Sequence, residues 1–232
     1  MSNEAQTRRA LIVWGGWDGH QPEQVAAVLG GELRAAGFEV TVSDTLDSLR
    51  DGDFLKKLDL IVPIWTMGSI EREQLTPLME AVESGVGLAG CHGGMCDSFR
   101  NSPDYQFMTG GQWVAHPGND GVTHEIQITD HEHFITAKSS NFTVSTEQYY
   151  MHVDPANQVL ATTRFPVAPG PHQANGPVDM PVVWTRMWGK GRVGYCSLGH
   201  HAEIVSLPEV LRICRRAMLW AAHAEELEVV SA

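Results

Sequence analysis

The sequence predicts an α/β fold in which a mostly parallel sheet is covered by helices on both faces. Apolar runs and amphipathic segments alternate through the first part of the chain, at the spacing of right-handed βαβ units. The apolar runs are continuous, which is typical of strands buried on both faces. In such a sheet the functional crevice lies outside the carboxyl ends of the strands.

Four strands and two helices are expected before residue 92. The strands cover residues 10–14, 38–43, 58–64 and 86–91, and the helices cover residues 21–36 and 71–84. Pro22 suits the first turn of the first helix, and Gly37 follows its end. Val25 and Leu29 lie on the apolar stripe between them. We expect Pro63 near the end of the third strand, because proline has no N–H for the ladder.

The second half of the chain predicts a long loop followed by short strands. Residues 102–123 are rich in glycine, proline and polar side chains, which predicts a loop laid over the carboxyl edge of the sheet. Strands are then expected over residues 122–129, 142–146, 158–164, 182–186 and 192–197, and an amphipathic helix over 207–222. We expect a single domain over residues 10–222, with tails over 1–9 and 223–232.

The composition indicates a globular protein with an acidic surface. Hydrophobic residues make up 43% of the 232 residues, charged residues make up 19%, and the net charge is −12. Nucleic acids and anionic membranes bind basic surfaces, so we expect neither as a partner. No apolar run approaches the roughly 20 residues of a membrane-spanning helix, and residues 1–9 lack the apolar core of a signal peptide. We therefore expect a cytoplasmic protein.

The stretch Gly90-Cys91-His92-Gly93-Gly94 predicts a sharp turn between a strand and a helix. This pattern is typical of turns that expose their central residue above the edge of a sheet. We expect His92 at the exposed tip and Cys91 at the end of the strand, facing the core. Two alternatives stay open: the stretch makes only a tight buried turn, or Cys91 is a nucleophile, which would need an exposed, electropositive position. The four cysteines form no C-x-x-C pair and are expected to be reduced.

Several histidines and carboxylates are expected at the same edge. The side chains that follow strands or lie on the covering loop are Asp18, His20, Trp65, His116 and His200. Imidazoles near a carboxylate such as Glu147 or Asp97 suit either a Zn²⁺ site with an open position or metal-free acid–base chemistry. The sequence lacks the H-x-x-x-H spacing of a helical zinc site, so both readings stay open.

Six ordered segments together resemble one protein family. They are Trp14 to His20, Gly90 to Phe99, Gly110 to Pro117, Glu147 to Tyr150, Pro181 to Trp184 and Gly191 to His200. The chain from about residue 10 to residue 222 is similar to the ThuA-like (trehalose utilisation) family. The resemblance implies a class I glutamine amidotransferase-like fold, a flavodoxin-like three-layer sandwich, in which His92 occupies the position of the amidotransferase nucleophile.

The resemblance also implies a carbohydrate ligand. We expect an enzyme that acts on a sugar or a 3-keto-glycoside by histidine and glutamate acid–base chemistry, as a lyase, hydrolase or isomerase and not as a glutamine amidotransferase. The expected catalytic residues are His92, Glu147, His200 and His20. The expected substrate-binding residues are Asp18, Trp17, Trp65, Asp97, His116, Tyr150 and Trp184. A divalent metal such as Zn²⁺ would be held by His20, His116 and His200.

The main alternative is a non-catalytic sugar-binding or regulatory domain on the same scaffold, since fold alone does not decide function. The number of ionisable groups expected at one edge favours the enzyme, because a binding pocket relies more on amides and aromatic rings. We expect no nucleotide cofactor, and we expect a homo-oligomer.

Overall fold

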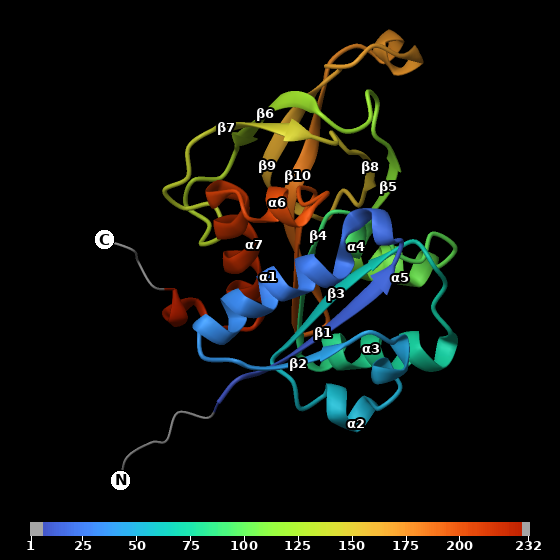
Figure 1. The fold of residues 1–232 in the computed structure, drawn as a ribbon, viewed down its shortest axis with the longest axis vertical. Helices are drawn as coiled ribbons and strands as arrows, with labels where there is room; N and C mark the ends of the chain where they lie inside the picture. Colours follow the sequence, from blue (N-terminus) through green and yellow to red (C-terminus); the bar gives the residue numbers. More distant parts are fainter. Residues whose placement is uncertain (1–6, 229–232) are drawn as a thin grey trace.

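A nine-stranded mixed sheet runs through the length of the molecule (Figure 1). The structure is a computed structural model that describes residues 7–228. The strand order is β2-β1-β3-β4-β11-β10-β9-β6-β7, and a separate two-stranded sheet pairs β5 with β8. The predicted tails, residues 1–9 and 223–232, lie partly outside the described residues.

The strands are β1 (Arg9–Gly16), β2 (Glu39–Ser43), β3 (Leu60–Thr66), β4 (Gly87–Cys91), β5 (Gly111–Ala115), β6 (Val122–Ile128), β7 (Phe142–Thr146), β8 (Tyr150–Val153), β9 (Gln158–Phe165), β10 (Val178–Trp188) and β11 (Gly191–Cys196). The α-helices are α1 (Pro22–Ala35), α2 (Gly52–Leu55), α3 (Arg72–Ser84), α4 (Gly93–Cys96), α5 (Pro103–Thr109), α6 (Ala202–Val205) and α7 (Pro208–Ala221). Short 3-10 turns are η1 (Asp18–His20), η2 (Leu46–Leu49), η3 (Pro171–Asn175) and η4 (Glu225–Leu227).

The first half of the sheet is parallel, as predicted. The pairs β1–β2, β1–β3, β3–β4 and β4–β11 are all parallel, and each predicted strand lies within two residues of its expected bounds. Pro63 lies inside β3, paired with Val13, and not at the end of the strand. The β3–β4 ladder stops at the pair Ile61–Leu88, so the missing N–H of Pro63 interrupts no pairing on that side.

The other half of the sheet is antiparallel, so the prediction of a mostly parallel sheet is wrong. The pairs β11–β10, β10–β9, β9–β6 and β6–β7 are antiparallel. Only Gly189 and Lys190 connect β10 to β11, and Gly189 has a φ of 57°. A two-residue connection can join only antiparallel neighbours, because a parallel pair needs a long crossover.

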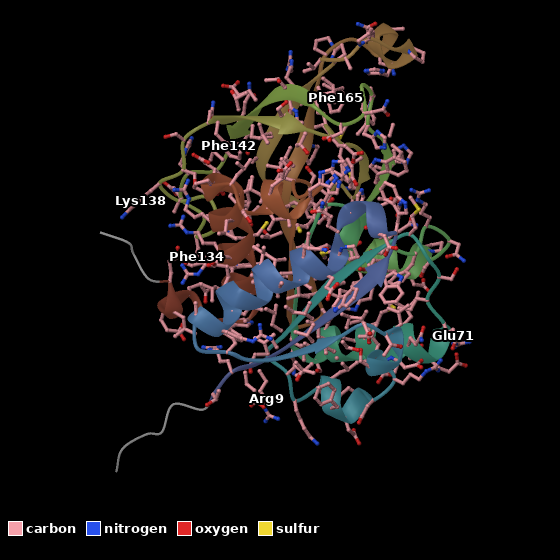
Figure 2. The ribbon with its side chains drawn as sticks, viewed as in Figure 1. Arg9, Glu71, Phe134, Lys138, Phe142 and Phe165 are labelled. Carbon is pink, nitrogen blue, oxygen red and sulfur yellow. The ribbon has the colours of Figure 1, made fainter. Side chains whose placement is uncertain are left out.

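Helices cover both faces of the parallel half, which confirms the prediction of three layers there. Ile12 of β1 and Val62 of β3 pack in one core with α1 and α7. Leu11, the neighbour of Ile12, faces the opposite core with α3, because successive side chains of a strand point to opposite faces. Phe134 and Phe142 extend the first core beside α7 (Figures 1 and 2).

The segment expected to be one long loop contains a helix and a strand. Pro103 occupies the first turn of α5, and Gly110 ends the helix with a φ of 84°. β5 then pairs with β8. Only the stretch that follows β5, from His116 to Gly121, has no helix or strand. Pro103 and Gly110, which lie in the stretch predicted as a loop, are therefore the start and end signals of a short helix.

Trp184 is a core residue, so the prediction that it binds substrate is wrong. It lies on β10 with 0% of its surface exposed, and its ring centroid is 4.2 Å from that of Tyr195. Its indole N–H donates to the Thr109 carbonyl at 3.0 Å. The hydrogen bond fixes the ring at the join between α5 and the sheet, and the ring does not line the inner site described below.

We expect Trp184→Phe to lower the free energy of unfolding by about 1–3 kcal/mol, because a buried volume and a hydrogen bond are lost together. Urea unfolding measures this change. The matched control is Trp17→Phe, whose side chain is 47% exposed and whose replacement should change stability by at most about 0.5 kcal/mol. Equal effects of the two replacements would contradict the assignment of Trp184 to the core.

Candidate functional site

The turn after β4 has the strained conformation that the sequence predicts. His92 has φ 49° and ψ −142°, values that a non-glycine residue adopts only when its surroundings hold it there. Its N–H donates to the Cys196 carbonyl at 2.7 Å, and the Tyr195 hydroxyl donates to its carbonyl at 3.0 Å. Gly93 follows because a Cβ there would lie 2.7 Å from the His20 ring.

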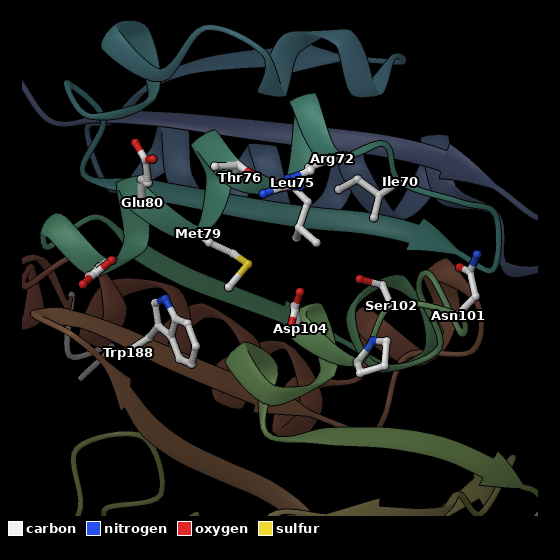
Figure 3. Close-up of a pocket in the computed structure, with 12 residues that line it drawn as sticks. Ile70, Arg72, Leu75, Thr76, Met79, Glu80, Asn101, Ser102, Asp104 and Trp188 are labelled. Carbon is white, nitrogen blue, oxygen red and sulfur yellow. The ribbon is translucent and has the colours of Figure 1, made fainter.

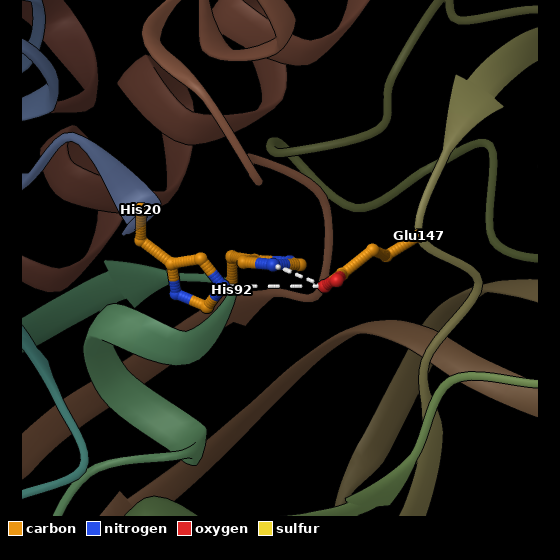
Figure 4. A group of neighbouring side chains, drawn as sticks. All are labelled: His20, His92 and Glu147. Carbon is orange, nitrogen blue, oxygen red and sulfur yellow. Dashed lines mark hydrogen bonds and ion pairs between the residues drawn. The ribbon is translucent and has the colours of Figure 1, made fainter. Parts of the chain in front are cut away.

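The structure brings four histidines around one carboxylate. Nε2 of His92 lies 3.2 Å from Oε2 of Glu147, and Nε2 of His20 lies 4.0 Å from the same oxygen (Figure 4). Nε2 of His200 and Nε2 of His116 lie 3.6 Å and 3.7 Å from the other oxygen, Oε1. The predicted convergence of these side chains at one edge of the sheet is therefore what the structure shows.

In three of these rings, Nδ1, the nitrogen that faces away from Glu147, has a contact of its own. Nδ1 of His92 donates to the Ser197 carbonyl at 2.8 Å, because a carbonyl oxygen can only accept. Nδ1 of His20 lies 2.9 Å from Thr66 Oγ1, and Nδ1 of His200 lies 3.2 Å from Asp120 Oδ1. The rings are thus oriented with Nε2 toward Glu147. In His92 a proton or a cation must lie between Nε2 and the carboxylate, since two lone pairs would repel.

Burial and charge set the protonation of this cluster. Burial alone would raise the pKa of Glu147, but the hydrogen bond from His92 and the neighbouring imidazoles outweigh it and lower that pKa. Burial, reinforced by the charges of His92 and His200, lowers the pKa of His20 to about 3. Burial likewise lowers the pKa of His200. Near neutral pH the site therefore combines an ionised carboxylate with neutral imidazoles from His20 and His200.

A cavity of about 280 Å³, here called the inner cavity, opens above Glu147. Of the predicted site residues it is lined by Trp17, His20, Asp97, His116, Glu147 and His200. Nε and Nη2 of Arg100 donate to the two carboxylate oxygens of Asp97, at 2.6 Å and 2.8 Å. Burial raises the pKa of Asp97 in spite of this ion pair. The ion pair occupies both oxygens of Asp97, which leaves Glu147 as the carboxylate at the centre of the histidines.

Four predicted residues lie elsewhere than expected. His92 is 1% exposed and sits beneath Glu147, so the prediction of an exposed tip is wrong. Asp18 is exposed on η1 and does not line the inner cavity. The ring of Trp65 packs against Gly15, where a Cβ would be 2.5 Å from it, and Tyr150 lines a different cavity. Asp18 and His92 lie in turns that follow strands, and Trp65 and Tyr150 lie within strands, so position at the edge of the sheet does not by itself predict which way a side chain faces.

The structure also adds residues that the sequence reasoning missed. Tyr149 stacks on His92 with ring centroids 3.9 Å apart, and it lines the inner cavity where Tyr150 was expected. Trp113 lines the same cavity, with the Arg100 guanidinium 4.6 Å from its ring centroid. Tyr149 lies two residues after Glu147, and residues two apart in an extended chain face the same side. That spacing could have identified Tyr149.

A further cavity of about 670 Å³ lies between α3 and α5 (Figure 3). Its walls include Leu75, Met79, Asp104 and Trp188, and none of its twelve lining residues, all from the described part of the chain, is a histidine. Ionisable groups with shifted pKa values that lie in a cleft mark a candidate functional site, and the inner cavity has them. We therefore assign the candidate site to the inner cavity.

A family model described as trehalose utilisation, ThuA, matches residues 9–221. The chain belongs to the ThuA family. No curated protein matches the chain. Within residues 7–228, no helix has both the length and the apolar character needed to cross a membrane. The family assignment agrees with the six sequence segments, and His92 and Glu147 both lie inside the matched range.

Solved structures of ThuA-like proteins share the fold. One from Parabacteroides merdae has a TM-score of 0.75 at 16% identity, covering 98% of this chain and 93% of that chain. One from Bacteroides uniformis has a TM-score of 0.72 at 17% identity, covering 97% and 94%. A protein from Salmonella typhimurium described as cytoplasmic has a TM-score of 0.61 at 16% identity, covering 95% and 100%. At these identities the comparison concerns the fold alone.

The donor atoms of this ThuA site fit a divalent metal ion. Nε2 of His20, Nε2 of His92 and a carboxylate oxygen of Glu147 lie within 4.8 Å of one another. Two of these rings bind a partner through Nδ1, which is the usual support of metal-bound histidines. The predicted set of His20, His116 and His200 differs from this one. His200 instead groups with Asp120 and His201, and His116 belongs to neither group among the described residues.

We expect the purified protein to bind about one Zn²⁺ per chain, because two neutral imidazoles and a carboxylate are a common Zn²⁺ ligand set. Glu147→Gln and His20→Ala should each lower the affinity at least about tenfold, as loss of a site group typically does. Elemental analysis after dialysis against Zn²⁺ measures occupancy. The control His116→Ala should keep the metal. An unloaded wild-type protein, or equal loss in the control, would contradict this ligand set.

Proposed function

We propose that this protein is an enzyme that acts on a keto-sugar or a 3-keto-glycoside, with Glu147 as its principal acid–base group. The supporting observation is the buried, ionised carboxylate of Glu147 at the inner cavity, with four imidazole Nε2 atoms within 4.0 Å of it. A carboxylate in this state can accept a proton, and the surrounding imidazoles can hold or return it. The family's name supplies the expectation of a carbohydrate.

The proposed reaction begins at a carbon beside a ketone. Glu147 removes a proton from that carbon, the C–H electron pair forms a double bond to the ketone carbon, and the π electrons of the ketone move onto its oxygen to give an enolate. As the ketone re-forms, the double bond shifts toward the next carbon, whose bond to the glycosidic oxygen breaks, and that oxygen takes a proton from an acid of the site. Addition of water to the new double bond completes a net hydrolysis, whereas its omission gives a lyase. Return of the proton from the enolate stage to the former ketone carbon, with no C–O bond broken, gives an isomerase.

Hydrolysis of an ordinary glycoside is less compatible with this arrangement. It generally uses two carboxylates flanking the bond, one of them an acid and the other a base or nucleophile. Here Asp97 is paired with Arg100 through both oxygens, and Asp120 lies beside His200 at the rim. Imidazoles grouped around one carboxylate are better matched to moving a proton to and from a carbon acidified by a neighbouring ketone.

The walls of the inner cavity suit a sugar. Trp17, Trp113 and Tyr149 present aromatic rings, which bind the apolar face of a sugar ring. Asn119 and Asp120 supply polar groups for its hydroxyls. A divalent ion held by His20, His92 and Oε2 of Glu147 would supply a Lewis acid that polarises the ketone oxygen, and Oε1 of Glu147 would remain available to accept the proton. The strand order β2-β1-β3-β4-β11 of the parallel half supports the flavodoxin-like arrangement that the family resemblance implies.

The decisive measurement is exchange of solvent deuterium into the substrate. With 3-keto-trehalose in D₂O, we expect the wild-type protein to exchange the proton beside the ketone, as followed by NMR. Glu147→Gln should lower the exchange rate about 100-fold or more, because its amide cannot accept the proton. Cleavage of unmodified trehalose without exchange would contradict the mechanism. Binding of sugars without exchange or cleavage would support the alternative of a binding domain.

Cys91 and His92 can be separated by substitution. Cys91 is 3% exposed at the end of β4, with Sγ facing Gly199, so Cys91→Ser should keep the exchange rate within about twofold. His92→Ala removes the hydrogen bond to Glu147 and should lower the rate about 100-fold and shift its pH profile. A larger loss from the serine variant would restore an amidase-like nucleophile.

A further inference from the structure

A second cavity adjoins the inner cavity and has a different character. This outer cavity measures about 750 Å³ and lies between the two-stranded sheet of β5 and β8 and the η3 turn. Its walls include Trp113, Pro117, Tyr150, His152 and His172. Among its twelve lining residues, all in the described part of the chain, there is no aspartate, glutamate, lysine or arginine.

The two cavities adjoin along side chains that they share. Trp113, His116 and Asn119 line the inner cavity and the outer cavity alike. The segment from Glu147 to His152 also serves both. Glu147 and Tyr149 line the inner cavity, and Tyr150 and His152 line the outer one.

We propose that the outer cavity binds the leaving unit of a two-ring glycoside whose reacting ring lies in the inner cavity. The proposal rests on the function proposed above and specifies its substrate class. A wall of aromatic rings and prolines without charged side chains fits a neutral ring with an apolar face. A second sugar and an aryl group both have this chemistry. A phosphorylated unit fits less well, because no lysine or arginine lines the outer cavity.

His116 lies where the oxygen joining the two units must pass. It borders both cavities, its side chain is 30% exposed, and its Nε2 is 3.7 Å from Glu147 Oε1. This position assigns it the acid of the proposed elimination. As the C–O bond breaks, the leaving oxygen takes a proton from His116 and departs as an alcohol into the outer cavity. The proton from the carbon remains on Glu147.

Binding of unreactive ligands tests the cavity without requiring turnover. The probes are glucose, with one ring, and trehalose and phenyl β-glucoside, with two. We expect the wild-type protein to bind a two-ring probe at least about fivefold more tightly than glucose, in an NMR titration, since aromatic contacts add affinity. Tyr150→Ala should remove that difference while leaving the affinity for glucose unchanged. The tighter of the two two-ring probes identifies the leaving unit as sugar or aryl.

Three further variants show whether the effect on binding is specific to the outer cavity. His172 lines the outer cavity and lies on η3, which has no buried residue. His172→Ala should therefore weaken two-ring binding without disturbing the fold. Tyr150→Phe keeps the ring and should bind as the wild type does. Phe107→Ala removes a 58% exposed ring that lines neither cavity and should have no effect.

Equal affinity for one-ring and two-ring probes, no measurable binding of either, or insensitivity to both Tyr150→Ala and His172→Ala would overturn the outer-cavity assignment. Deuterium exchange into a keto-sugar together with any of these results would leave the proposed function standing. A preference for two-ring probes that depends on Tyr150, in a protein that catalyses no exchange, would support the outer-cavity assignment and contradict the proposed function.

Discussion

A buried negative charge needs compensation, and in this protein the carboxylate of Glu147 receives it from imidazoles on four separate segments. Their Nε2 atoms lie 3.2–4.0 Å from its oxygens. Three of these rings are oriented from behind by Thr66, Ser197 and Asp120. The contact therefore ties the ends of β1, β4 and β11 to the connection between β7 and β8. Loss of one partner would leave a buried charge poorly compensated.

The mixed sheet explains why these segments can meet. Its parallel half places the residues after β1, β4 and β11 at one edge, because parallel strands end on the same side. The antiparallel half of the sheet leads the chain back over that edge. Glu147 lies there, in the connection between β7 and β8. Neither half contains the whole site. β5, β8 and the connection between β9 and β10, which contains η3, form the outer cavity.

The turn at His92 has the backbone of a nucleophile-bearing turn, yet its central residue does not reach solvent. The left-handed backbone conformation of His92 is held by hydrogen bonds from Tyr195 and to Cys196. Glu147 and Tyr149 lie over the imidazole, so the turn supports a carboxylate instead of presenting a nucleophile. Burial raises the pKa of the nearby Cys96 thiol, which keeps that sulfur protonated. The turn therefore holds His92 as a hydrogen-bond partner of Glu147 and not as an exposed side chain.

Local sequence patterns determined the strands β1 to β4, the helices α1, α3 and α7, and the sharp turn at His92, because apolar periodicity and Gly or Pro signals act over a few residues. They also indicated that His20, His92, His116 and His200 would meet. The direction of β10, β9, β6 and β7 depends on pairing between distant segments, which periodicity does not encode. The burial of Trp184, the selection of Tyr149 over Tyr150 and the position of Asp18 outside the inner cavity depend on how loops pack after the strands have paired. Only the tertiary structure decided those, since each side chain's environment is set by residues far away in the sequence.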